Sequence, residues 1–387
     1  MAPDATARSY SEAYDLIKGC KDVDVLNTAS AKVSLKAQAR VPGAKRIPGS
    51  DIYATGKGRS FRAGGLLNME TKEIPTHAAK MKNMVTCGMR CTAIGSMHVI
   101  FALYGYSTFT WRWAAIGWFI FAFFGIVGIT MGYHRMLTHK SFKTYKWLEY
   151  LIAFIGTQAG QGDPIEWVST HRYHHLHTDT PLDPHSPYEG FWWSHLLWLT
   201  GTEHSLLDYA NVPDLKNQLF YRVMEFTFFP LLFIVKPILM YKMGGMAQVC
   251  WTCAFPLVWG YHTTFLVNSA SHIWGSRPYN TGDLSTNNIW VALLAFGEGW
   301  HNAHHAFPYS ARHGLEWWEF DPTWYLICAL KSLGLVWDVQ VPSEKAKALK
   351  RNKPASAAAA APVAEAEADT ACGRDQDGKA ANTSKEE

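Results

Sequence analysis

The chain has 387 residues, of which 14% are aromatic and only 18% are charged, and its 17 tryptophans are typical of a protein that meets a membrane interface. Its net charge of +4, without a concentrated basic cluster, argues against nucleic acid as a partner. The seven cysteines are odd in number and irregularly spaced, which argues against a disulfide framework.

The first 85 residues are polar and lack helical or strand periodicity, so we expect a leader or flexible extension. Residues 27–65 are rich in Ala, Ser, Thr, Lys and Arg with Asp51 as their only acidic residue, which resembles an organellar transit peptide. Several acidic residues upstream depart from that pattern. We predict a chloroplast membrane location, with the endoplasmic reticulum membrane as the alternative.

Four apolar segments are predicted to cross a membrane, whose hydrocarbon core requires about 20 helical residues. Residues 91–111, 113–132 and 246–267 are uncharged. Residues 223–243 are a weaker candidate because they contain Lys236 and two prolines, which a spanning helix tolerates when its neighbours cover the backbone.

Two shorter apolar segments, residues 148–160 and 289–296, are expected at the membrane interface or under a soluble cap. The chain ends in an Ala-, Glu- and Lys-rich stretch that predicts a disordered tail. The predicted organisation is a leader (1–85), an all-α integral membrane domain with four transmembrane helices (86–343) and a tail (344–387).

Most of the 17 histidines occur in groups. Two H-x-x-H-H groups place imidazoles at i, i+3 and i+4, on one face of a helix. An H-x4-H group directly follows the second predicted span, and an asparagine and a histidine four residues apart follow the last. The grouped side chains are His134, His139, His171, His174, His175, Asn268, His272, His301, His304 and His305.

The predicted spans place these groups on one side of the membrane. If the seven Lys and Arg residues within 57–90 stay on the cytoplasmic or stromal side, two crossings return the chain to that side at His134. Two further crossings bring Asn268, His272 and the last group back to it. The groups can therefore meet at the ends of the spans, whereas transporter sites lie near the bilayer midplane.

Nine histidines and one asparagine exceed the roughly four ligands of a tetrahedral zinc site and suit two metals. Imidazole binds Zn, Cu, Fe and Ni, so the ligand type alone does not select the metal. Oxidation of an unactivated C–H bond in an apolar lipid needs redox chemistry with dioxygen. We therefore predict two Fe²⁺ ions, dioxygen as co-substrate, and a catalytic requirement for all nine histidines.

Other residues near the groups receive less specific predictions. His98, His262 and His313 are predicted to be structural. Four histidines are undecided between supporting the ligands and a structural role: His177, His185, His195 and His204. Carboxylates that could hold the ligand imidazoles are Asp163, Glu166, Asp179, Asp183 and Glu298. The chain has only one E-x-x-H unit, at Glu298, whereas carboxylate di-iron bundles need two.

The segments QGDPIEWVSTHRYHH (residues 161–175) and EGFWWSH (residues 189–195), with residues 280–318, resemble the plant and algal delta-9-type membrane fatty-acid desaturases. That family includes acyl-CoA desaturases and the plastid palmitoyl-monogalactosyldiacylglycerol delta-7 desaturase. The resemblance covers residues 91–343. It implies a four-span stem, a helical cap that holds two irons, and a bent tunnel for the acyl chain. It also implies that the nine grouped histidines bind the metals and that Asn268 approaches one metal through water.

The acyl carrier and the electron donor stay open at this point. Ser169 and Thr170 stand where animal acyl-CoA enzymes carry an Arg-Asp pair, and the loss of that arginine favours a glycerolipid over a CoA substrate. The chain contains no haem-binding His-Pro-Gly-Gly motif, so we expect a separate donor. Ferredoxin fits a plastid, and a cytochrome b-type protein fits the endoplasmic reticulum.

We predict oxygen-dependent desaturation of a lipid-bound saturated acyl chain, and specifically delta-7 desaturation of a palmitoyl galactolipid. The main alternative is delta-9 desaturation of acyl-CoA or another acyl lipid. A di-iron hydroxylase is a second alternative because it shares the first hydrogen abstraction. A membrane metal carrier and an inactive relative are the non-enzymatic alternatives.

Overall fold

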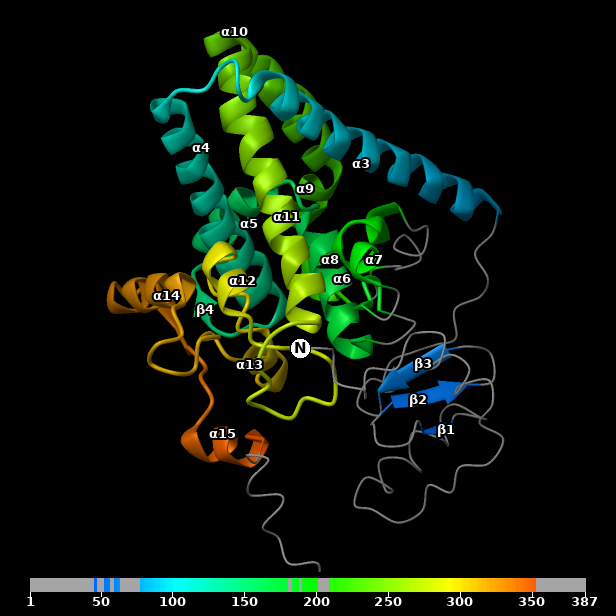
Figure 1. Ribbon diagram of the computed structural model, residues 1–387, viewed down its shortest axis with the longest axis vertical. Coiled ribbons are helices and arrows are strands. Elements are labelled where there is room, and N and C mark those ends of the chain that lie inside the picture. The colour runs from blue at the N-terminus through cyan, green and yellow to red at the C-terminus, as the bar shows by residue number, and fades with distance from the viewer. Residues whose placement is uncertain are drawn as a thin grey trace, which may run out of the picture. The chain divides into compact units, whose positions relative to one another are not determined.

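The computed structural model describes residues 45–46, 52–55, 59–62, 77–179, 183–187, 190–200, 209 and 211–352, and most of them lie in helices (Figure 1). The predicted leader and tail lie largely outside the described residues. Within the leader, three short strands pair antiparallel: β1 (Lys45–Arg46), β2 (Ile52–Thr55) and β3 (Arg59–Arg62). Strands of four residues or fewer are too short for their periodicity to be recognised in the sequence.

The first predicted span, residues 91–111, does not form one continuous helix. Helix α3 (His77–Tyr104) starts earlier and ends earlier than predicted. Helix α4 (Trp111–Phe123) then begins at a new cap, because the Thr110 hydroxyl accepts a hydrogen bond from the Trp113 amide at 3.1 Å. Hydropathy alone does not reveal such a cap within an apolar stretch.

Two helical runs among the described residues are long and apolar enough to cross a membrane, Trp111–Thr138 and Leu219–His272. The first contains the predicted second span and joins α4 to the π-helix η2 (Phe124–Thr138). The second has 54 residues, or about 80 Å of helix, and contains the predicted third and fourth spans. Four crossings remain a prediction.

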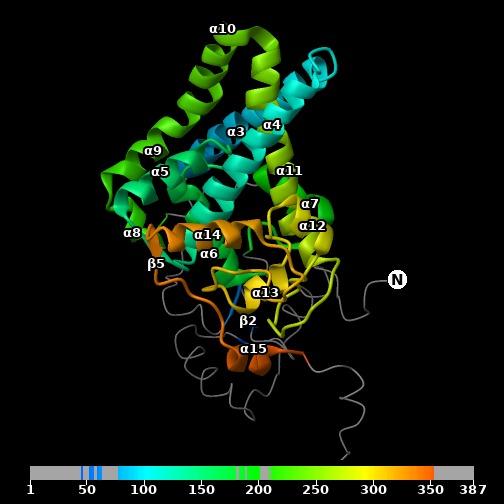
Figure 2. The ribbon, with the colours of Figure 1, turned by 90° about the vertical axis from the view of Figure 1, so that its left-hand side faces the viewer.

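The longer run reverses direction within α10 (Lys236–Val249), as Figure 2 shows. Gly244 and Gly245 leave the helical conformation there, and Gly245 has a φ of 64°, which glycine adopts more readily than other residues. The other elements of this run are α9 (Leu219–Pro230), η6 (Leu231–Val235), η7 (Cys250–Ala254), α11 (Phe255–Ser269) and η8 (Ala270–His272).

Shorter elements complete the described structure. They are β4 (Lys143–Thr144), α5 (Lys146–Thr157), α6 (Pro164–His177), α7 (Phe191–His195), η4 (Leu197–Thr200), α8 (Pro213–Lys216), α12 (Ile289–Leu294), α13 (His301–Ala306), α14 (Pro322–Ser332), β5 (Val336–Trp337) and α15 (Glu344–Lys350). Strands β4 and β5 pair antiparallel. The two short apolar segments of the sequence form α5 and α12, and each exposes large apolar side chains such as Leu151 and Leu293.

A buried apolar core holds η2 against α5 and α6. Met131 of η2, Ile152 of α5 and Ile165 of α6 belong to this core and are at most 2% exposed. The helices approach closely because two glycines face each other: a Cβ atom at Gly128 would lie 2.6 Å from the Cα atom of Gly156. The core therefore holds η2, which carries His134, beside α6, which carries the first H-x-x-H-H motif.

Candidate metal centre

The nine histidines predicted to bind metal lie together in two groups. Within each group the ligand nitrogens lie within 4.8 Å of one another. The five-histidine group consists of His134, His139, His171, His175 and His304. The four-histidine group consists of His174, His272, His301 and His305. Segments far apart in the sequence therefore meet at one centre, while the ligand role of each histidine stays a prediction.

Each H-x-x-H-H motif contributes to both groups. In α6, His171 and His175 join the five-histidine group and His174 joins the other; in α13 the assignment is reversed, and His304 joins the five-histidine group. A helix turns by about 100° per residue, so the side chains at i and i+4 point within about 40° of each other, whereas that at i+3 points about 100° away from that at i+4. One motif therefore contributes side chains to two adjacent groups.

Local sequence sets the direction of α6. Its N-cap is Asp163, whose carboxylate accepts hydrogen bonds from the amides of Ile165 at 2.8 Å and Glu166 at 3.1 Å. Pro164 occupies the first turn, where a missing N–H costs nothing. These features begin the helix about two turns before His171, the first of its four histidines.

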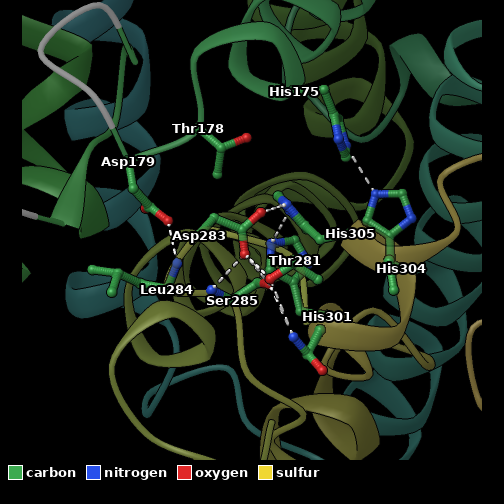
Figure 3. Close-up of polar contacts among 12 residues, drawn as sticks. His175, Thr178, Asp179, Thr281, Asp283, Leu284, Ser285, His301, His304 and His305 are labelled. Carbon is green, nitrogen blue, oxygen red and sulfur yellow. Dashed lines mark hydrogen bonds and ion pairs between the residues drawn. The ribbon is translucent and has the colours of Figure 1, made fainter. Parts of the chain in front are cut away.

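The ring nitrogens face one another across each group. The Nε2 atom of His304 lies 3.1 Å from that of His134 and 2.9 Å from that of His175, and Figure 3 shows the second contact. In the other group, the Nε2 atom of His301 lies 2.9 Å from that of His272 and 3.0 Å from that of His305.

Such convergence fits metal ions. A neutral imidazole offers one N–H donor, so a set of Nε2 atoms that face one another cannot pair all its lone pairs by hydrogen bonds. The Nε2 atom of His139 is buried and has no hydrogen-bond partner. A cation bound among the nitrogens would satisfy these lone pairs, as imidazole ligands do in metalloproteins.

The protonation state also suits metal binding. Burial, reinforced by the neighbouring imidazoles, lowers the pKa of His139, His171, His175, His301 and His304 well below the usual value. Imidazole must be neutral to bind a metal. These side chains are therefore ready to act as ligands at neutral pH.

Four of the nine imidazoles predicted to bind metal have a carboxylate beside the Nδ1 atom, on the opposite side of the ring from Nε2. The Nδ1 atom of His134 is 2.7 Å from Glu298, that of His174 is 2.9 Å from Asp183, that of His272 is 3.0 Å from Asp179, and that of His305 is 3.0 Å from Asp283. Burial alone would raise the pKa of Asp183, but His174 and His185 lower it below the usual range. An Nδ1–H held by a carboxylate leaves Nε2 free for the metal.

Three of the five carboxylates predicted to support the ligands lie against imidazoles that are predicted to bind metal: Asp179, Asp183 and Glu298. The candidate role of Asp163 and Glu166 was wrong, because Asp163 caps α6 and Glu166 pairs with Arg90.

Asp283 was missed. It lies in the segment between η8 and α12, where no periodic pattern indicates its orientation. Figure 3 shows it between His305 and the hydroxyls of Thr281 and Ser285, which donate hydrogen bonds to it.

Two further histidines lie against the centre. His313 was predicted to be structural. Its Nδ1 atom is 3.2 Å from the Glu298 carboxylate, and its ring centroid is 4.6 Å from that of His304. The ring centroid of His185, for which the sequence left a supporting and a structural role open, is 4.4 Å from that of His174.

Another three histidines belong to neither group. His98, His262 and His195 form a separate row in which successive ring nitrogens are 3.1 Å apart. His204 lies outside the described residues, as does the side-chain environment of His177.

A cavity with about 800 Å³ of empty space, part of which is open to solvent, lies against both groups. One end of the cavity is lined by histidines of both groups, and we call it the metal end because these residues are predicted to bind metal. They are His134 and His171 of the five-histidine group and His174 and His301 of the four-histidine group. Asn268, the tenth predicted ligand, lines the same cavity. Most other lining side chains are apolar or small and include Phe121, Phe124, Ile129, Leu257 and Val267. The cavity can therefore accommodate an apolar molecule beside the histidines that are predicted to bind metal.

Acid is expected to destabilise the metal-free protein. Burial is the main cause that lowers the pKa of His305 and His313 to about 4 and that of His185 to about 3. Below about pH 6.5 the unfolded chain binds protons at these positions that the folded chain does not bind, so stability falls from there toward pH 4. The loss of stability is measured as a fall in the melting temperature of the metal-free protein between pH 7.5 and pH 4. A constant melting temperature would contradict it.

Comparison with known proteins gives consistent matches. A family model described as fatty acid desaturase matches residues 110–331, which contain all ten predicted ligands. The "Acyl-CoA C20 Delta5-desaturase" of Anemone leveillei is 50% identical over 254 residues, 65% of this chain and 81% of the relative. The "Palmitoyl-monogalactosyldiacylglycerol delta-7 desaturase, chloroplastic" of Arabidopsis thaliana is 51% identical over 257 residues, 65% and 68% of the two chains. The "sn-1 stearoyl-lipid 9-desaturase" of Anabaena variabilis is 48% identical over 250 residues, which cover 63% of this chain and 90% of the relative.

Proposed function

This chain belongs to the fatty acid desaturase family and is an oxidoreductase that desaturates fatty acyl chains, and we propose that its substrate is a saturated acyl chain carried by a membrane glycerolipid. The observation that carries the proposal is the largely apolar cavity whose metal end is lined by histidines of both groups. Delta-7 desaturation of a palmitoyl galactolipid is the specific reaction proposed.

The nine histidines and Asn268 would hold two irons. When bound, the irons supply the dioxygen-dependent oxidising power needed to break unactivated C–H bonds, which zinc does not provide. The buried carboxylates Asp179, Asp183, Asp283 and Glu298 hold the Nδ1 side of four imidazoles and so orient their Nε2 atoms toward the metals.

The chain's own contribution to the reaction is to position the substrate. Each methylene buried against walls such as Phe124 and Leu257 stabilises the complex by about 0.8 kcal/mol. A chain held along its length presents one pair of adjacent methylenes to the metal end, and this alignment is a large part of catalysis. The same walls exclude water from the reacting carbons.

Two considerations support a plastid galactolipid. Residues 27–65 have the composition of an organellar transit peptide, and one relative is named for the chloroplast and that lipid. A plastid membrane would supply ferredoxin as the electron donor. The relatives named for acyl-CoA and for a stearoyl lipid support the alternative, delta-9 or other desaturation of acyl-CoA or another lipid, with a cytochrome b-type donor in the endoplasmic reticulum.

Expression of the full chain in a galactolipid-containing host without its own desaturase tests the proposal. We expect palmitoyl chains of the galactolipid to gain one double bond at C7, identified after separation of the lipid classes. Unsaturation confined to acyl-CoA would remove the galactolipid, and a hydroxylated product would indicate the hydroxylase. Bound metal without oxygen consumption would support a metal carrier. A fluorescent protein fused to residues 1–85 tests the compartment.

A further inference from the structure

Two glycines line the cavity, and they differ in what surrounds them. Gly125 lies in η2 and Gly260 lies in α11. A Cβ atom at Gly125 would lie 2.6 Å from the ring of Phe296, so this glycine makes room for a neighbouring side chain. A Cβ atom at Gly260 would approach only the ring of Phe121, at 3.9 Å. A methyl group at residue 260 would therefore fit without a clash, in ordinary van der Waals contact with Phe121.

Helix packing does not explain Gly260. Buried glycines elsewhere in the helices stand where another element approaches: a Cβ atom at Gly117 would lie 2.7 Å from Phe255, and one at Gly128 would lie 2.6 Å from Gly156. A glycine inside a helix destabilises it by about 1 kcal/mol relative to alanine. Gly260 is buried inside α11 without such a neighbour, so the missing side chain contributes space to the cavity.

The position of this space relative to the metals follows from α11. Asn268 lies eight residues after Gly260 in the same helix and lines the cavity together with His301. Eight residues of α-helix correspond to about 12 Å along its axis. Gly260 therefore borders a part of the cavity remote from the reacting carbons, where Phe121 lines it as well.

We propose that Gly260, with Phe121 opposite, determines the longest acyl chain that this enzyme accepts. The inference rests on the proposed role of the cavity as the acyl site. A side chain at residue 260 would occupy volume that the remote carbons of a long chain need, whereas a shorter chain would still reach the metal end.

Variants of the full chain test this. In a host supplied with saturated chains of graded length, Gly260→Leu is expected to lower conversion of the longest accepted chain by about tenfold or more relative to the shortest, since a misfit of one methylene in an apolar pocket already changes discrimination by about 10- to 200-fold. Gly260→Ala should give a smaller shift in the same direction.

Gly95→Leu is the matched control. Gly95 lies in α3, is exposed, and would have no atom within 4 Å of an added Cβ atom. The same substitution there should leave the chain-length profile unchanged. An unchanged profile in Gly260→Leu, or an equal loss at every chain length, would overturn the inference.

A binding measurement separates this inference from the proposed function. Saturated fatty acids of graded length are added to the purified protein, and the rise in melting temperature reports their binding. The rise should continue to longer chains in the original protein than in Gly260→Leu, and coincident curves would overturn the inference. If the original protein makes no unsaturated product in the host, the proposed function fails while the binding series still tests Gly260.

Discussion

Replacing His304 with alanine is expected to reduce desaturation to the background of the host and to remove the metal of the five-histidine group. The Nε2 atom of His304 lies 2.9 Å from that of His175 and 3.1 Å from that of His134, and the side chain is buried. Alanine removes a nitrogen from the middle of this set. The four-histidine group keeps all its own ligands, so the purified variant should retain the second metal.

Two measurements are needed: iron per chain in the purified protein and unsaturated product in the host. His98→Ala is the control, because His98 belongs to neither group and its Nε2 atom faces that of His262 at 3.1 Å. That variant should keep both metals and the product. Full iron content together with normal product in His304→Ala would remove His304 from the set of ligands.

The meeting of the histidine groups could be predicted from the sequence because it depends on helical periodicity and span order. The spacing in both H-x-x-H-H motifs predicts a shared helix face, and the structure brings the side chains together. Asp283 and His313 could not be predicted. Both lie outside regular elements, where only the tertiary fold decides which side chain reaches His305 or Glu298.

Some features of the helices could likewise be predicted from the sequence, whereas others could not. The predicted boundary between residues 243 and 246 coincides with Gly244 and Gly245, where the long run reverses, because glycine interrupts an apolar pattern visibly. The π-helical conformation of η2, which carries His134, could not be predicted, because hydropathy does not distinguish α- from π-helices. π-Helical turns are frequent at functional sites, and here one ends at the first histidine group.

Replacement of Arg135 by methionine is expected to lower the melting temperature strongly. Arg135 is fully buried, and its guanidinium donates hydrogen bonds to both carboxylate oxygens of Asp321 at 3.0 Å and to Glu298 at 3.2 Å. It also donates to the Ala311 carbonyl at 2.8 Å. Methionine would fill similar volume but leave two buried carboxylates without this cation, and breaking a buried ion pair costs about 3–5 kcal/mol.

The exposed pair of Lys143 and Asp338 provides the control. Their side chains are 69% and 58% exposed, so Lys143→Met should change the free energy of unfolding by at most about 1 kcal/mol. Arg135→Lys should lie between the two variants, because lysine keeps the charge but cannot form the paired hydrogen bonds to Asp321. Equal melting temperatures for Arg135→Met and Lys143→Met would contradict the prediction.

The same substitution links stability to the metal centre. The Glu298 carboxylate accepts one hydrogen bond from Arg135 and lies 2.7 Å from the Nδ1 atom of His134 and 3.2 Å from that of His313. The guanidinium therefore helps to hold the carboxylate that orients the His134 ring. Loss of such a supporting contact typically lowers metal affinity by about 10- to 100-fold. We therefore expect Arg135→Met to release iron to a chelator faster than Lys143→Met at a temperature where both variants remain folded. Equal release rates would limit Arg135 to a role in folding.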